Sequence, residues 1–313
     1  MPIELLERKR KPVERRPLAS EEQPEGRRAH VPLIRAKPSL SRRLLRQRRA
    51  LYAAALIALV TILSVLAPLF SPHGRDAMDL DRILAPPSPA HILGTDELGR
   101  DIFTRILHGG RVTLLVAFAS VLIATLLGVT LGSLAGYFGG FWERFVTGAV
   151  DLFMSIPVFL LLLLLISLGG RGIWLVPLAI GCTSWMETAR VSRSRLLSLK
   201  SSDFALAARS LGLNDAALIY RHLLPHALPH VIAAATVGFA HAMLVESALS
   251  FLGFGVQPPV PTWGNMLQNA QIFLRTSPVI AVAPGLMIFL MCISFNFIGE
   301  GLRKALAETS RSC

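Results

Sequence analysis

Residues 112–134 read VTLLVAFASVLIATLLGVTLGSL, a stretch without a single charged side chain. A helix needs about 20 apolar residues to cross the hydrocarbon core of a bilayer, so this stretch is long enough to span a membrane. Its glycines do not argue against a helix, because neighbouring membrane helices can support the local backbone. The stretch predicts a transmembrane helix and raises the question of how many others the chain contains.

The composition of the whole chain indicates the same class of protein. Of the 313 residues, 52% are hydrophobic and only 17% are charged, whereas a soluble domain usually carries about 25% charged residues. So few charges do not cover a water-facing surface, which argues against a soluble enzyme. The high apolar content argues against a disordered chain. We therefore predict an all-α polytopic membrane protein.

Six apolar stretches predict six transmembrane helices. They are, in chain order, Leu51–Phe70, Val112–Leu134, Val146–Leu168, Ile173–Trp185, Leu228–Leu252 and Val279–Ile298. The fourth is short and is expected to extend in both directions. Pro157 interrupts the third stretch, and Pro284 with Gly285 interrupts the sixth. We expect these three residues to be flex points.

The distribution of charge predicts the orientation in the membrane. The net charge is +12, and residues 1–50 hold fifteen Lys/Arg against six Asp/Glu. Next to a first span, such a tail fits the positive-inside rule better than it fits a nucleic-acid-binding arm. The loop 190–226 is also basic, whereas the loop 250–278 carries one Arg and no acid. Both termini are therefore expected in the cytoplasm, and the mixed-charge loop 71–111 is expected outside.

This pattern divides the chain into four parts. Residues 1–48 are a basic tail without periodicity, which we expect to be disordered, and the span that follows is expected to be an uncleaved anchor. Residues 49–110 hold the first span and an external loop with a surface helix. Residues 111–305 form a core of five spans, and residues 306–313 are a cytoplasmic C-terminal tail.

The surface helix is expected to begin within residues 94–101, which read GTDELGRD. Thr95 can cap it, because its hydroxyl can accept a hydrogen bond from an unpaired backbone N–H. Asp96 and Glu97 then suit the positive end of the helix. The pair Gly109–Gly110 is expected to end it.

The loop between the fourth and fifth spans predicts two short helices. Residues 201–225 read SSDFALAARSLGLNDAALIYRHLLP. Ser201, Ser202 and Asp203 can cap the start of the first helix. Gly212 suits the position just after the end of that helix. Asn214 or Asp215 can cap the second helix. Pro225 is expected to stop it. An apolar ridge on the first helix is predicted to be exposed, namely Phe204, Ala207, Ala208 and Leu211. An ordinary amphipathic interfacial loop has the same pattern.

The same loop resembles the "EAA…G…LP" loop of permease subunits of bacterial ATP-binding-cassette (ABC) importers. The matching residues are Ala207, Ala208, Gly212, His222, Leu224 and Pro225. Residues 249–259 (LSFLGFGVQPP) and 262–267 (TWGNML) resemble the external loop of the peptide and nickel branch, through Gly253, Gly255, Pro258, Pro259 and Trp263. Residues 94–101 resemble the "C" permeases for dipeptides and oligopeptides. One departure is Leu206, which stands where the family has an acid; Asp203 could partly replace that acid.

The resemblance implies a type I ABC importer transmembrane domain in the bacterial inner membrane that moves short peptides. Nickel or another small solute is the alternative within this family. The loop Ser202–Pro225 would dock on a cytoplasmic ATPase. The implied partners are a second homologous permease, two ATP-binding subunits, an extracytoplasmic substrate-binding protein and the lipid bilayer, with no nucleic acid.

ATP chemistry is assigned to a partner chain. A phosphate-binding P-loop needs a Gly-Lys-Ser/Thr sequence, and none of the five lysines follows a glycine. The chain is therefore expected to be a non-catalytic subunit that binds no cofactor of its own. A membrane-embedded enzyme or a structural anchor is the alternative of another class.

Ionisable residues within the spans are candidates for a pathway or gate, because charge at membrane depth is costly and often functional. They are Asp151, His241 and Glu246. A packing ion pair or an interfacial carboxylate is the structural alternative for the two acids.

Metal binding is not predicted. His222, His226 and His230 recur at every fourth position, which is the spacing of a metal-binding helix face. Pro225 and Pro229 interrupt that face, however, and no carboxylate or cysteine joins it. The three cysteines of the chain also lack the spacing of a zinc site or a disulfide framework.

Overall fold

The computed structural model describes residues 47–170 and 172–310, with side chains described to residue 307. The predicted tails fall largely outside these residues, at 1–46 and 311–313. The elements are α2 (Arg48–Val65), α3 (Ala67–Phe70), η1 (Leu80–Arg82), α4 (Ile102–Phe138), α5 (Gly140–Ser155), α6 (Val158–Gly169), α7 (Leu175–Thr183), α8 (Trp185–Lys200), α9 (Asp203–Ser210), α10 (Asp215–Ala217), η2 (Leu218–Leu223), α11 (Leu224–Phe251), α12 (Trp263–Met266), η3 (Ala270–Phe273) and α13 (Val279–Ser310). Within the described residues, β pairing is confined to one isolated bridge, which confirms the all-α class.

The structure contains fewer helices able to span a membrane than the six predicted from the sequence. Four helical segments are long and apolar enough to cross a membrane: α2, α4, the continuous helix from α10 to α11, and α13. Helices α5 and α6 make a fifth only as a broken span, bent by 89° next to Pro157. The predicted span Ile173–Trp185 corresponds to α7, whose nine residues reach only about 13 Å. Six spans are therefore not confirmed.

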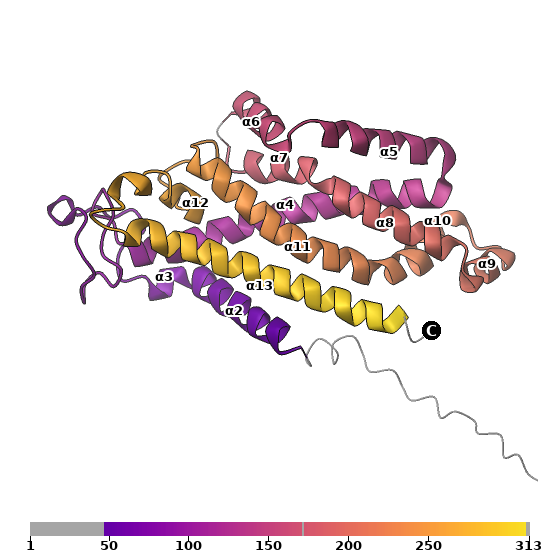
Figure 1. The fold of residues 1–313 in the computed structure, drawn as a ribbon, viewed down its shortest axis with the longest axis horizontal. Helices are drawn as coiled ribbons and strands as arrows, with labels where there is room; N and C mark the ends of the chain where they lie inside the picture. The colour runs from indigo at the N-terminus through magenta and orange to yellow at the C-terminus, as the bar shows by residue number, and fades with distance from the viewer. Residues whose placement is uncertain (1–46, 171, 311–313) are drawn as a thin grey trace, which may run out of the picture. The chain divides into compact units, whose positions relative to one another are not determined.

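Helix α4 is the element around which the others pack (Figure 1). It contacts α2, α5, α7, α8 and α11. Helices α5 and α6 lie on the side away from α2 and α13. A row of three glycines, Gly128, Gly132 and Gly136, lets α8 approach closely. A Cβ atom at Gly132 would lie 2.4 Å from the carbonyl oxygen of Ala189. Small residues at every fourth position are a common means of close packing between membrane helices.

The start of α4 corrects the predicted surface helix. The helix begins at Ile102, and the Asp101 carboxylate caps it by accepting a hydrogen bond from the Thr104 N–H at 2.8 Å. Thr95 is not the cap, because its hydroxyl contacts the preceding loop instead. The glycine pair does not end the helix either. A Cβ atom at Gly110 would lie 2.4 Å from the Ser64 hydroxyl, so that glycine allows α2 to pack closely.

The predicted stop at Pro225 is also wrong. Pro225 lies in the first turn of α11, and Pro229 lies inside the same helix, which continues to Phe251. The preceding turn, η2, is π-helical, and local π-type turns are one way in which membrane helices accommodate proline. Pro284 likewise lies within the continuous helix α13.

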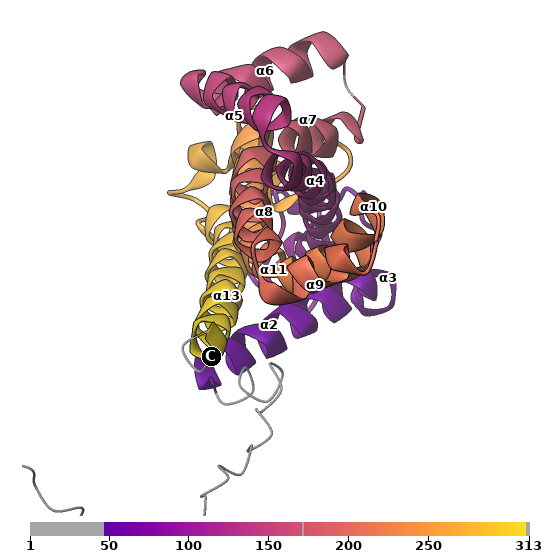
Figure 2. The ribbon, with the colours of Figure 1, turned by 90° about the vertical axis from the view of Figure 1, so that its right-hand side faces the viewer.

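The two ends of the described chain meet at one end of the bundle. The Gln47 side-chain amide donates a hydrogen bond to the Gly301 carbonyl at 3.2 Å, so the start of α2 lies beside the last turns of α13. Figure 2 looks onto this end and shows α9 and α10 there. Helix α13 runs to Ser310, so the predicted C-terminal tail is helical in its first residues.

Candidate functional site

Apart from Asp151 on α5, three parts of the molecule hold the residues predicted to be functional. They are the inner loop (residues 201–225), the outer loop (residues 252–278) and a polar face of α8 and α11 between them. The inner loop lies at the end of the bundle where the described termini meet, and the outer loop follows the opposite end of α11.

Helix α9 of the inner loop is anchored by one small residue. Ala205 is fully buried in an apolar cluster; its other members are Tyr137, Leu196, Leu218, Ile219, Leu223 and Ala227. Leu206 and Leu211 are exposed, at 50% and 81%. Ala205 therefore faces the bundle and is not part of a partner surface, whereas the neighbouring leucines are open to one.

The remaining predicted residues of the inner loop are at least partly exposed. These are Asp203, Ala207, Ala208, Gly212, His222, Leu224 and Pro225. Gly212 has a φ of +81°, a conformation that other residues adopt only with strain. The predicted tight turn is thus confirmed, and so is the Asn214 cap, whose side-chain oxygen accepts a hydrogen bond from the Ala217 N–H at 2.7 Å. Phe204 is exposed, as predicted, and one face of its ring stacks on His226.

Tyr137, at the end of α4, joins the inner loop to the bundle. Its hydroxyl donates a hydrogen bond to the Asp215 carboxylate. Lys200 and Arg209 lie over its ring, with Nζ and Cζ 5.5 and 5.2 Å from the ring centroid. The loop thus meets the end of α4 through one aromatic side chain and three charged ones.

The outer loop is fastened by Trp263, which is fully buried. Its backbone N–H donates to the Thr113 hydroxyl at 3.1 Å, and its indole N–H donates to the Ile106 carbonyl at 2.9 Å. Both acceptors belong to α4. Of the other predicted residues, Gly253 is half-buried, Gly255 is buried, and Pro258 and Pro259 are exposed.

Glu246 belongs to this outer set of contacts. Its side chain is completely buried, and its carboxylate accepts a hydrogen bond from the Ser250 hydroxyl at 2.7 Å and a longer one from Ser247. Gly264 packs against the same serines, since a Cβ atom there would lie 2.6 Å from the Ser247 Cα. Glu246 is thus held by serine hydroxyls within the described residues, rather than by the packing ion pair that was the structural alternative, and its role in a gate stays a prediction.

Asp151 is the third residue predicted for a pathway or gate. It is exposed on α5 and lies 3.7 Å from Arg190. Since ion pairs between exposed side chains contribute little to stability, this pair is expected to stabilise the fold only weakly, and the pathway and interfacial interpretations both stay predictions.

His241 lines a cavity of about 180 Å³ between α4, α7, α8 and α11, together with Ser184, Glu187 and Thr188. A second cavity of about 370 Å³ shares Glu187 and adds Arg195, His230 and Arg303. A polar track thus runs along α8 and α11 toward the inner end.

Glu187 in this track lies level with the apolar stretch of α4. It precedes Thr188, whose side chain packs on Gly128 within the apolar stretch of α4. Glu187 is nevertheless exposed. We did not predict Glu187 to be a pathway residue. The signal for it in the sequence is a single acidic residue near the end of a short apolar stretch.

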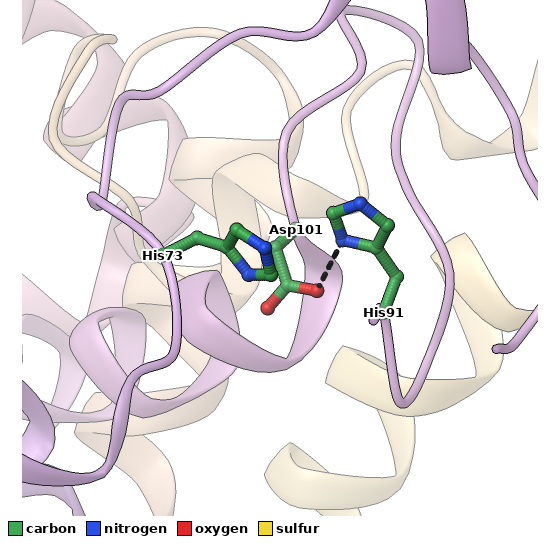
Figure 3. Close-up of side chains that lie close together, drawn as sticks. All are labelled: His73, His91 and Asp101. Carbon is green, nitrogen blue, oxygen red and sulfur yellow. Dashed lines mark hydrogen bonds and ion pairs between the residues drawn. The ribbon is translucent and has the colours of Figure 1, made fainter. Parts of the chain in front are cut away.

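One group of metal-ligating side chains comes together in the part of the chain that the structure describes. It consists of His73, His91 and Asp101 (Figure 3). The histidines predicted not to form a site remain apart from it: His226 bonds the His222 carbonyl, and His230 lines the larger cavity.

Comparison with known families gives two matches. Residues 128–308 match the family described as "binding-protein-dependent transport system inner membrane component". Residues 40–87 match the "N-terminal TM domain of oligopeptide transport permease C".

Curated relatives match over most of their length. A glutathione transport system permease protein of Pectobacterium atrosepticum is 37% identical, over 91% of this chain and 97% of the relative. A dipeptide transport system permease protein of Alkalihalophilus pseudofirmus is 34% identical, over 87% and 89%. A putative peptide permease protein of Brucella suis is 37% identical, over 84% and 88%.

Among solved structures, a chain of the inward-facing MetNI methionine ABC transporter is similar. The TM-score is 0.50 at 19% sequence identity, covering 63% of this chain and 96% of that chain. At this level of identity the likeness concerns the fold alone.

Proposed function

The chain belongs to the family of binding-protein-dependent transport system inner membrane components, and on that premise we propose that it imports short peptides. It is a membrane permease subunit of an ABC importer, and ATP hydrolysis belongs to a separate subunit of such importers. The observation that carries the peptide assignment is the set of relatives named for dipeptides, peptides and glutathione, which match 84–91% of this chain.

The inner loop is the proposed contact with the ATPase. Leu206 and Leu211 are exposed apolar side chains on a short helix at the end of the bundle, and a surface of this kind fits a groove on a partner. Behind them, Ala205 and Tyr137 fix the loop to the bundle, so that a displacement of α9 reaches α4 and α11. In the full transporter we expect two such ATPase subunits, which bind the ATP.

The polar track along α8 and α11 is the proposed wall of the transport pathway. An exposed carboxylate at membrane depth, such as Glu187, is costly against lipid, and His241 is exposed on the same side of the bundle. A second permease facing this track would enclose it and replace the lipid. The polar side chains would then line a hydrated path.

The proposed orientation puts the inner loop and both ends of the described chain in the cytoplasm. The basic loop 190–226 and the basic residues before α2 favour that side. The outer loop then faces the extracytoplasmic binding protein, which delivers the substrate. The bacterial inner membrane is the setting in which such a binding protein operates.

Co-purification tests the assignment of the inner loop. The tagged chain would be purified in mild detergent and the accompanying subunits identified, with wild type compared to Gly212→Arg. We expect wild type to recover a second permease and ATPase subunits, and the variant to lose the ATPase. The site is open, since a Cβ atom at Gly212 would meet no atom within 4 Å.

Gly170→Arg is the matched control. Gly170 also has a positive φ, of +88°, and equally open surroundings, but it lies beyond the outer end of α6. Normal ATPase recovery in Gly212→Arg would contradict the docking assignment. Reconstituted transport of a dipeptide, with nickel as the competing cargo, then tests the substrate class.

A further inference from the structure

We propose that His73, His91 and Asp101 bind one divalent transition-metal ion of the Zn²⁺ class outside the transport pathway. One potential ligand atom from each residue lies within 4.8 Å of the others. The three come from separate places in the chain: His73 from the loop after α3, His91 from a turn further along, and Asp101 from the start of α4 (Figure 3).

The pair of His91 and Asp101 already has the spacing of two ligands on one ion. The His91 Nδ1 and the Asp101 Oδ1 lie 3.1 Å apart, and both side chains are buried. Two bare lone pairs at this distance repel, so either a proton or a cation lies between them. Ligands about 2.0–2.1 Å from a tetrahedral Zn²⁺ ion lie roughly 3.3 Å from each other. The observed separation therefore suits a metal as well as a proton.

His73 supplies the third ligand. Its Nδ1 is buried and has no hydrogen-bond partner, which is costly for a polar atom out of contact with water. Its ring stacks on His91 with centroids 4.5 Å apart. An imidazole nitrogen binds a metal in the plane of its ring, so binding requires the His73 ring to turn toward the Asp101 carboxylate. Coordination would satisfy the unpaired nitrogen.

The surroundings hold two of the ligands in place. The Asp101 Oδ2 accepts the N–H of Thr104, which leaves Oδ1 directed toward the histidines. The His91 backbone exchanges two hydrogen bonds with Ser88, at 2.8 and 3.1 Å. The neighbouring Arg100 pairs with Asp96 and Glu97. The Thr104 N–H thus acts as an outer partner that orients a metal ligand, and the other bonds fix the segments next to the site.

The ligand types select the class of ion. Two imidazoles and one carboxylate suit Zn²⁺ and similar ions, whereas Ca²⁺ and Mg²⁺ prefer sets made only of oxygen. A bound ion would connect the segment that contains His73 and His91 to the first turn of α4. It would thus cross-link the region outside the first span, a role independent of which solute is carried.

Zinc titration of the full-length chain tests this proposal. The chain would carry an affinity tag without histidine and would be titrated calorimetrically in detergent at neutral pH. We expect one Zn²⁺ per chain and a higher unfolding temperature with Zn²⁺ than with a chelator. His73→Ala should weaken binding by more than the roughly 10- to 100-fold cost of losing an outer partner and abolish the temperature shift. His73→Phe should do the same while keeping an aromatic ring against His91.

Two histidines outside the cluster serve as controls. His108→Ala changes another histidine near the outer end, and His226→Ala removes the central member of the inner histidine row. Both should bind Zn²⁺ as wild type does. A wild-type chain that takes up no Zn²⁺ would overturn the proposal. Unchanged affinity in both His73 variants, or loss of binding in His226→Ala, would overturn it equally.

Discussion

At the outer end, Trp263 and Glu246 are fully buried and their polar atoms are bonded to α4 and to neighbouring serines. At the inner end, Ala205 of α9 packs in an apolar cluster with Tyr137, whereas Leu206 and Leu211 are exposed. The outer loop is therefore fixed from within the protein, whereas the inner loop presents side chains that only a partner would cover. If the inner loop docks on the ATPase as proposed, movement would enter at the inner end while the outer loop keeps its shape.

The largest effect is expected from Trp263→Ala. Removing a buried tryptophan costs about 3–5 kcal/mol and also leaves the Ile106 carbonyl without its indole N–H donor. We expect a large drop in the thermal unfolding midpoint of the purified chain and loss of transport. Trp174→Ala is the control, because Trp174 is 66% exposed and should unfold as wild type does. Equal unfolding midpoints for the two variants would contradict the conclusion that the outer loop is the more firmly fixed of the two loops.

A smaller effect is expected from Glu246→Ala. The change leaves two buried serine hydroxyls without their acceptor, at a cost of about 1–3 kcal/mol. Glu246→Gln should restore both stability and transport, since its amide oxygen can still accept the Ser250 hydroxyl. A Gln variant that is stable but inactive would instead show that the charge itself is needed, as in a gate.

At the inner end, Tyr137→Phe should have a modest and local effect. It removes the hydrogen bond to Asp215 while keeping the ring, so we expect a loss of about 1 kcal/mol. Hydrogen exchange should rise in α9 and α10 and stay unchanged around Trp263. Tyr220→Phe, at a tyrosine 66% exposed, is the comparison. Faster exchange at the outer loop as well would mean that the two ends are not separately fastened.

The smallest effect is expected from Leu206→Glu, which introduces the acid seen in the family. An exposed position should change stability by no more than about 0.5 kcal/mol, and a carboxylate near a helix start is favourable. We expect an unchanged midpoint and ATPase recovery at least equal to wild type. Ala205→Glu, one residue earlier, buries a charge and should destabilise the loop. A similar loss of stability in both variants would contradict the exposure of Leu206 on α9.

Much of this comparison could be predicted from local patterns. The apolar stretches predict α2, α4, α11 and α13, and Gly212 with Asn214 predicts the inner turn, because each depends on neighbouring residues alone. The resemblance to the family also predicts the position of the outer loop and the class of the protein.

What could not be predicted depends on contacts between distant segments. Gly109–Gly110 looks like a helix end until Ser64 and Trp263 are seen packed against it. Pro225 looks like a stop until the π-helical turn before it is known. Glu246 looks like a gate residue because the sequence does not show that Ser250 and the outer loop enclose it. The row Gly128, Gly132 and Gly136 has the spacing of a helix-packing motif, but only the structure shows that α8 packs against it.

The continuous helix that begins at Asp215 and ends at Phe251 gives the two ends a mechanical relation. Its first residue is bonded to Tyr137, and its last turns carry Glu246 and Ser250. At 1.5 Å per residue this rod is about 55 Å long, so a small tilt imposed at one end becomes a displacement of several ångströms at the other. With its outer end packed against Gly264 through Ser247, this helix would pivot about that end. The largest displacement would then fall on the inner loop, the proposed contact with the ATPase.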